Sequence, residues 1–315
     1  MMPRSVAITG AGLVTPLGAG VAANLAALHE GCCGLQPAPE SIPWWTGRVA
    51  GPALPEDLPA KLLGQSKYLN RGGVLAVQAA GEALRQAAPP EEVAAPRRSV
   101  YVATGDLNLV GCDFLYPALR ESAGSGGDLV DPARLNRHTV EQVNPFFLLE
   151  TLSNNPFSFL TALCGAMGPG TSLAGQSPCG SNALELAFRA VRHGRADLAV
   201  AAGSTSWVNP VALFEMEGLG LLSRGRAGAK SFRPLDRRRD GFLPGEGGAA
   251  LVLEPLEQAR ARGAAILGEV LGVANTARAL AGLAVAPRVT FDCLAQAISA
   301  AGCSPAELGF VCPHG

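Results

Sequence analysis

Short apolar runs alternate with longer amphipathic or alanine-rich stretches along most of the chain. The short runs predict buried strands, and the longer stretches, with apolar residues at helical spacing, predict helices. Strands that alternate with helices indicate parallel or mixed sheets with both faces covered, which is the α/β class. The expected strands are 6–9, 100–104, 198–203, 249–253, 266–274 and 310–312, and the expected helices are 21–30, 71–88, 156–167, 210–217, 255–262 and 289–301.

Two segments interrupt this alternation. Residues 37–66 are rich in proline and glycine and contain Trp44 and Trp45, and we expect them to form an excursion outside the core. Residues 105–150 form a long insertion that we expect to be irregular. Insertions of this kind often line a site or an interface.

The segment 168–203, GPGTSLAGQSPCGSNALELAFRAVRHGRADLAVAAG, carries the clearest functional signal. It predicts a strand, a sharp turn at Ser177, an amphipathic helix, a glycine and a second apolar strand. Enzymes of the α/β class present a nucleophile in this way, because unpaired N–H groups and the dipole of a helix N-terminus favour a developing anion. The same residues also suit a plain helix start, since serine is a preferred N-cap and proline is enriched at the next position. Both interpretations of Ser177 remain open.

The composition predicts a folded protein with a substantial core. Hydrophobic residues make up 48% of the 315 residues and charged residues only 16%, unlike a disordered chain. The net charge of −1 gives no reason to expect nucleic acid as a partner. The basic run Arg237–Arg239 lies between Asp236 and Asp240, and we interpret it as a solvated loop, with docking of an anionic partner as the alternative.

The N-terminus and the cysteines set expectations about location and cofactors. The N-terminus has no apolar signal-peptide core, and no uncharged apolar run is long enough for a membrane span, so we expect a cytoplasmic protein. The eight cysteines form no CxxC pair and no zinc-ligand spacing, which predicts buried, reduced thiols and no metal site. The opening TGAGLVTPLG lacks the third glycine of a dinucleotide-binding fingerprint, so we expect no nicotinamide cofactor, nor any other.

Several segments together resemble the β-ketoacyl synthases of the thiolase-fold superfamily. They are VAITGAGLVTPLG near the start, the Gly-Pro at 168–169, GRADLAVAAG at 194–203, KSFRPLDRRRDGFLPGEGGAALVLEPLEQARARG at 230–263, and FVCPHG at 310–315. The resemblance implies a five-layer αβαβα fold built from two similar halves. On that basis residues 1–255 form the N-terminal half, with insertions at 37–66 and 105–150, and residues 256–315 form part of the C-terminal half.

The resemblance also implies a set of site residues. The family's nucleophilic cysteine falls on Ser177 when residues are counted from Gly168–Pro169, or backward from Gly194, whereas Cys179 would need a compensating insertion and deletion. A helix N-terminus can make a cysteine reactive without a dedicated base, but a serine hydroxyl needs a general base within reach. His314, which matches the family's first active-site histidine, is the candidate base.

Two candidate substrate-binding residues lie in the glycine-rich loop that the family uses near its active site. These are Phe242 and Glu246, and we expect Glu246 to fix the loop by hydrogen bonding rather than to transfer protons. The sequence ends at Gly315, immediately after the position of the first histidine, whereas the family continues to a supporting lysine and a second histidine. We therefore expect the C-terminal half to be incomplete.

The implied activity is decarboxylative condensation of an acyl chain with a malonyl thioester held on acyl carrier protein. The chain is then expected to form a homodimer, or a heterodimer with a second ketosynthase-like subunit. Serine at the cysteine position and the absent second histidine predict impaired catalysis. Two alternatives remain: a non-catalytic subunit similar to chain-length factors, and a malonyl-thioester decarboxylase, which needs no nucleophile.

Overall fold

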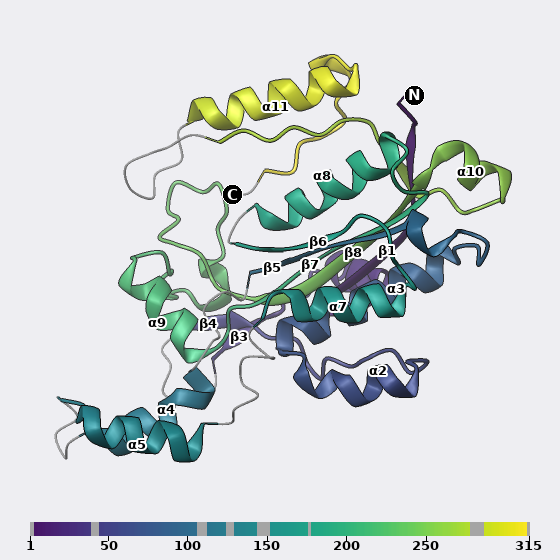
Figure 1. Cartoon of the computed structure of the whole chain (residues 1–315). Coiled ribbons are helices and arrows are strands. Elements are labelled where there is room, and N and C mark those ends of the chain that lie inside the picture. Colours follow the sequence, from purple (N-terminus) through teal and green to yellow (C-terminus); the bar gives the residue numbers. More distant parts are fainter. Residues whose placement is uncertain are drawn as a thin grey trace.

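Seven strands of the described residues form one mixed sheet, shown in the computed structural model of the chain in Figure 1. The structure describes residues 3–38, 44–105, 112–123, 129–143, 152–175, 178–277 and 287–313. The strands of this sheet are β1 (Val6–Thr15), β2 (Gly18–Ala19), β5 (Arg98–Thr104), β6 (Thr171–Ala174), β7 (Leu198–Ser206), β8 (Glu246–Pro255) and β9 (Gly268–Val270). Their order is β2-β1-β8-β7-β5-β6, and β9 pairs with the start of β1. Strands β5, β6 and β7 are parallel, whereas β8 runs antiparallel to both β7 and β1, so the predicted α/β class with a mixed sheet is confirmed.

Helices cover both faces of the sheet. The α-helices among the described residues are α1 (Val21–His29), α2 (Ala60–Gln65), α3 (Arg71–Ala87), α4 (Cys112–Ser122), α5 (Pro132–Gln142), α7 (Asn154–Leu163), α8 (Cys179–Arg192), α9 (Pro210–Gly218), α10 (Leu256–Ala261) and α11 (Pro287–Ala301). Side chains alternate between faces along a strand. In β5, Val100 and Val102 therefore join the core under α3 and α7, whereas Tyr101 and Ala103 join the core under α8.

Strand β1 lies directly on the backbone of α3 because of two glycines in the opening TGAG. A Cβ atom at Gly10 would lie 2.1 Å from the Ala83 carbonyl oxygen, and one at Gly12 would lie 1.8 Å from the Ala79 oxygen. The glycines that suggest a nucleotide fingerprint therefore serve close helix–sheet packing. The Glu82 carboxylate of α3 strengthens the contact by accepting a hydrogen bond from the Leu13 amide at 2.9 Å.

The expectation that residues 37–66 lie outside the core is wrong in part. Strand β3 (Leu35–Pro37) pairs with β4 (Trp45–Gly47) in a separate two-stranded sheet. Val49 and Leu62 are each only 5% exposed and belong to the core between the main sheet and α3. The proline-rich composition concealed these contacts, because single apolar residues in an irregular segment give no periodic signal.

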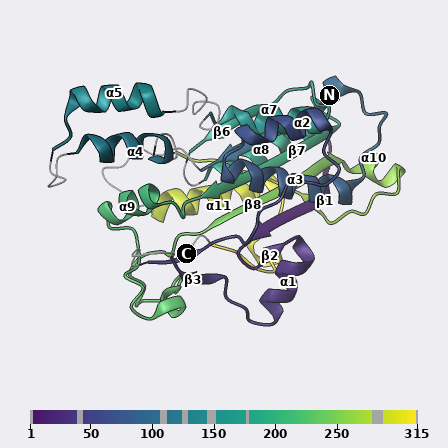
Figure 2. The same ribbon diagram turned by 90° about the horizontal axis from the view of Figure 1, so that it is seen from below.

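The expectation of an irregular segment at 105–150 is wrong for most of the part that the structure describes. Helices α4 and α5 form a hairpin that both Figure 1 and Figure 2 show projecting from the body of the molecule. The Asp131 side chain caps α5 by accepting hydrogen bonds from the amides of Ala133 and Arg134, and Pro132 occupies the first helical position. The Asp-Pro pair was a helix-start signal in the sequence. Residues 106–111, 124–128 and 144–150 of this segment lie outside the described residues.

The residues that follow β8 pack against the main sheet and add the short strand β9 to it. Helix α10 packs against the core residue Ala7, and β9 is shorter than the expected strand 266–274. The following residues lie along α8, where the Asn275 side-chain amide donates to Asn182 at 2.9 Å, and Figure 1 shows α11 beyond them. The expected strand at 310–312 is not formed: Phe310 is 86% exposed, and a strand needs a neighbour to satisfy its backbone. A domain division at residue 255 stays a prediction.

Asp197 holds the start of β7 through two arginines. Its carboxylate accepts two hydrogen bonds from Arg97, each 2.8 Å long, and one of 2.7 Å from Arg4. The Arg97 hydrogen bonds are the main cause that lowers the pKa of Asp197 to about 2. Because the folded pKa lies below the unfolded value, this stabilisation is present above the unfolded pKa and is lost as the pH falls toward 2.

We therefore expect Asp197→Asn to be less stable than the wild type near neutral pH and to lose less stability on acidification. Denaturant unfolding at a series of pH values between about 5 and 2 measures both effects. The control is Asp57→Asn, because Asp57 is exposed. A profile for Asp197→Asn as steep as that of the wild type would contradict the assignment.

Candidate functional site

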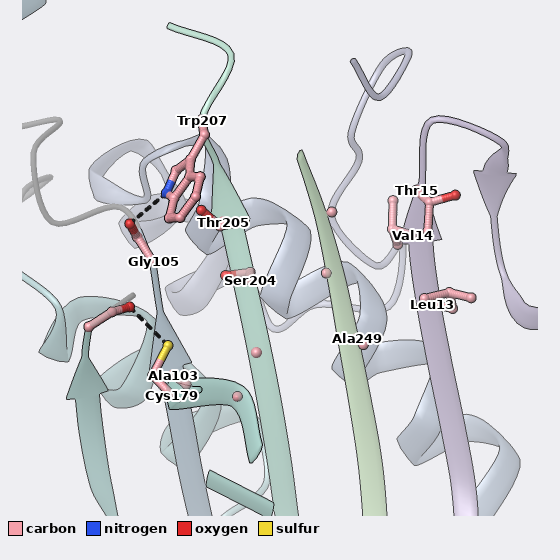
Figure 3. Close-up of a pocket in the computed structure, with 15 residues that line it drawn as sticks. Leu13, Val14, Thr15, Ala103, Gly105, Cys179, Ser204, Thr205, Trp207 and Ala249 are labelled. Atoms are coloured by element: carbon pink, nitrogen blue, oxygen red, sulfur yellow. Dashed lines mark hydrogen bonds between the residues drawn. The ribbon is translucent and has the colours of Figure 1, made fainter. Parts of the chain in front are cut away.

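A pocket of about 460 Å³ opens beside the start of α8, where β5 and β7 reach their carboxyl ends (Figure 3). In α/β folds this end of parallel strands is where ligands bind. None of the fifteen described residues that line the pocket is charged. They are Leu13, Val14, Thr15, Ala103, Gly105, Gly175, Cys179, Gly180, Gly203, Ser204, Thr205, Trp207, Gly247, Gly248 and Ala249.

The floor of the pocket is open because small residues meet there across three strands, β5, β7 and β8. Ala103 of β5 pairs with Gly203 of β7, Gly203 pairs with Ala249 of β8, and Ala249 pairs with Leu13 of β1. Residues two apart on a strand share a face, so Gly247 continues the same surface toward the strand end. Side chains no larger than a methyl group therefore leave the backbone of three neighbouring strands uncovered.

Cys179 lies at the edge of this pocket as the first residue of α8. Its thiol is half-buried and donates a hydrogen bond to the Gly175 carbonyl oxygen, with an Sγ–O distance of 3.0 Å (Figure 3). The Thr104 carbonyl oxygen lies 3.9 Å from the same sulfur. The first turn of a helix carries unpaired backbone N–H groups, which favour a developing negative charge, whereas the Gly175 carbonyl acceptor favours the protonated thiol.

Ser177 and His314 both lie outside the described residues, and their roles stay predictions. The structure does correct the expected start of the helix. Pro178, and not Ser177, occupies the N-cap position, because the Asn182 amide donates to the Pro178 carbonyl oxygen at 3.1 Å. Proline offers no side-chain acceptor, so the cap has no side-chain hydrogen bond.

Glu246, the first residue of β8, is the centre of a buried hydrogen-bonded cluster. Its carboxylate accepts two hydrogen bonds from Arg71, of 2.7 and 2.5 Å, and one of 2.7 Å from the Ser206 hydroxyl. The Val49 amide donates a fourth at 2.7 Å. Burial alone would raise the pKa of the Glu246 carboxyl, but these hydrogen bonds together outweigh it and hold the pKa below its ordinary value. The carboxylate joins three distant segments and is not among the residues that line the pocket.

Phe242 does not line the pocket, but its ring lies beside that of Trp207, which does. The side chain is 36% exposed, and its ring centroid lies 6.3 Å from that of Trp207. Its backbone is held by a hydrogen bond from the Phe242 amide to the Leu221 carbonyl oxygen at 3.0 Å. Of the loop glycines 241, 245 and 247, Gly241 alone has a positive φ, of 136°.

Sequence reasoning missed Trp207, whose indole N–H donates to the Gly105 carbonyl oxygen at 2.8 Å. It also missed the small residues of the floor, such as Gly203 and Ala249. The one usable signal was position, since Trp207 directly follows β7 and the carboxyl end of a buried strand is where α/β sites form. The pairing of the floor residues depends on strand register, which the sequence does not give.

Other expectations concern metals, thiols and the basic run. No group of three potential metal ligands occurs among the described residues, and no described helix has the length and apolar character of a membrane span.

The expectation of buried thiols is wrong for Cys32, Cys33 and Cys312, which are exposed. Cys164 is buried as expected, and its burial raises the pKa of the thiol to about 12. The run Arg237–Arg239 is exposed.

Comparison with known proteins identifies relatives across nearly the whole chain. The ketoacyl synthase alpha subunit of the tetracenomycin polyketide synthase of Streptomyces glaucescens is 30% identical, over 99% of this chain and 72% of that protein. The 3-oxoacyl-(acyl-carrier-protein) synthase 2 of Coxiella burnetii is 28% identical, over 100% of this chain and 74% of that protein. A solved type II polyketide ketosynthase in complex with its acyl-carrier protein superimposes with a TM-score of 0.75 at 25% identity, covering 97% of this chain and 72% of that one.

The same family emerges from a comparison with family models. The model described as the N-terminal domain of β-ketoacyl synthase matches residues 3–259. This range contains the whole main sheet apart from β9, together with the pocket and Cys179. The chain belongs to the β-ketoacyl synthase family.

Proposed function

We propose that this protein is an acyltransferase of the β-ketoacyl synthase type, which joins an acyl thioester to a malonyl thioester with loss of CO₂ in fatty-acid or polyketide assembly. The observation that carries the proposal is an uncharged pocket with the Cys179 thiol at its edge. An apolar pocket suits a hydrocarbon chain, and a thiol at a helix start suits an acyl acceptor. The acyl and malonyl groups would arrive on the phosphopantetheine arm of an acyl carrier protein, the kind of partner with which one relative was solved.

We propose the Cys179 thiolate as the acyl acceptor. It attacks the carbonyl carbon of the acyl thioester, the bond to the carrier sulfur breaks, and the carrier thiolate takes up a proton. The malonyl thioester then loses CO₂, and the resulting carbanion attacks the acyl-enzyme carbonyl and releases the cysteine. Backbone N–H groups in the first turn of α8 are the proposed donors to the oxyanion of each step.

Ser177 is the rival acceptor because it takes the family's cysteine position in the ungapped register. A serine hydroxyl is a weak nucleophile unless a general base lies within hydrogen-bond reach. His314 is the proposed base in that case. The two acceptors can be separated directly, because only the true one carries the acyl group.

We expect intact-mass analysis after incubation with an acyl thioester to show one acyl adduct on the wild type and on Ser177→Ala, and none on Cys179→Ala. Cys33→Ala is the matched control, since Cys33 is an exposed thiol that does not line the pocket. An adduct kept by Cys179→Ala and lost by Ser177→Ala would move the acceptor to Ser177. No adduct on any variant would contradict the acyltransferase proposal.

A non-catalytic role is the second candidate, favoured by the serine at the cysteine position. In this role the chain pairs with a cysteine-bearing synthase and shapes its acyl pocket, as chain-length factors do. It predicts co-purification with that synthase and no acyl adduct. Release of CO₂ from a malonyl thioester without any adduct would instead indicate a decarboxylase.

A further inference from the structure

Trp207 stands at one end of the pocket in a fixed orientation (Figure 3). Its indole N–H donates to the Gly105 carbonyl oxygen at 2.8 Å, directly beyond the end of β5. A Cβ atom at residue 105 would lie 2.7 Å from the Thr205 hydroxyl oxygen and 3.4 Å from the indole nitrogen. Glycine at this position therefore lets the ring approach the strand end closely.

The far side of the indole is supported by a separate apolar cluster. Trp207 packs against the buried residues Trp44, Leu213, Met216 and Leu222, which join α9 to the segments around it. The Phe242 ring lies beside the indole at an interplanar angle of 50°. Because the indole has packed side chains behind it and a hydrogen bond at its nitrogen, it forms a firm wall between the pocket and this cluster.

We propose that Trp207 sets the length of the acyl chain that the pocket accepts, by closing the pocket at the end toward α9. This inference rests on the proposed function, because it assumes that an acyl chain occupies the pocket. Burial of each methylene strengthens binding by about 0.8 kcal/mol, which is about 4-fold in affinity. Affinity therefore rises with chain length only until the chain meets the indole.

The test uses thioether analogues of acyl-pantetheine, which bind but cannot transfer their chain. Their dissociation constants are measured by titration calorimetry over a series of increasing chain length, for the wild type and for Trp207→Ala. We expect the wild-type affinity to level off at a definite length. In Trp207→Ala the rise continues beyond that length, by about 4-fold for each methylene that enters the vacated space.

Two more variants keep the test decisive if Trp207→Ala is poorly folded. Trp207→Phe keeps a ring on the apolar cluster and should move the length limit by a smaller step in the same direction. Ala249→Leu fills the floor instead and should shorten the accepted chain. Trp45→Ala is the matched control, since Trp45 contacts the segment near Gly228 and does not line the pocket.

The possible outcomes separate the inference from the function on which it rests. A length limit that is the same in the wild type and in folded Trp207→Ala and Trp207→Phe overturns the role of Trp207 while leaving acyl binding intact. A shift of the same size in Trp45→Ala overturns it as well. Binding of no analogue to any variant contradicts the proposed function, and the inference fails with it.

Discussion

Replacement of Glu246 by alanine is expected to lower the free energy of unfolding by about 3 kcal/mol, the range for breaking a buried ion pair. Glu246 is 5% exposed, and its carboxylate accepts four hydrogen bonds from three segments. Removing it leaves the Arg71 guanidinium without its carboxylate and the Ser206 hydroxyl and Val49 amide without their acceptor. Each of these groups loses its hydrogen bonds to water on folding and, in the variant, gains no hydrogen bond to Glu246 in return.

Urea unfolding of Glu246→Ala, Arg71→Ala and the double variant tests this expectation. The double variant should lose less stability than the two single losses added together, because each single change leaves a charged partner behind. Glu257→Ala is the matched control: Glu257 forms an exposed pair with Arg260 at 3.4 Å, and such pairs contribute less than about 1 kcal/mol. Additive single effects, or a loss below about 1 kcal/mol for Glu246→Ala, would contradict the assignment.

Gly12→Ala is expected to cost about 3 kcal/mol or more, and to prevent soluble expression if the wild type is marginally stable. The new Cβ would lie 1.8 Å from the Ala79 carbonyl oxygen, in the backbone of α3. The position of the new Cβ is fixed by the backbone of β1, and the atoms it meets belong to the backbone of α3. A change of side-chain rotamer therefore cannot relieve the clash. Strand β1 would have to move away from α3, which opens the core around both elements.

The control for this substitution is Gly268→Ala on β9. Gly268 also lies in a strand of the same sheet, opposite Ile8, but a Cβ there would meet no atom within 4 Å. We expect a change within about 0.5 kcal/mol, as for surface substitutions away from packed features. The thermal unfolding midpoints of both variants compare the two positions directly, and similar midpoints for them would rule out the steric explanation.

The elements that the sequence predicted well carry their signal locally. The alanine-rich stretch at 71–88 ends before two prolines, and α3 ends at Ala87 with Ala88 in the left-handed region. Strand β7 begins with the continuous apolar run 198–203 and lies inside the sheet. The predicted strand at 310–312 failed for the opposite reason, since an apolar run becomes a strand only where a neighbouring strand accepts its hydrogen bonds.

The sequence by itself determined the α/β class and most of the strands and helices, because periodicity and turn residues act over short distances. Only the tertiary structure decided which residues share the site. Sheet register aligns Ala103, Gly203 and Ala249 into an open floor, and the ends of β5 and β7 bring Gly105 beneath Trp207. Glu246 and Arg71 are 175 residues apart, and nothing local to either residue specifies that they pair.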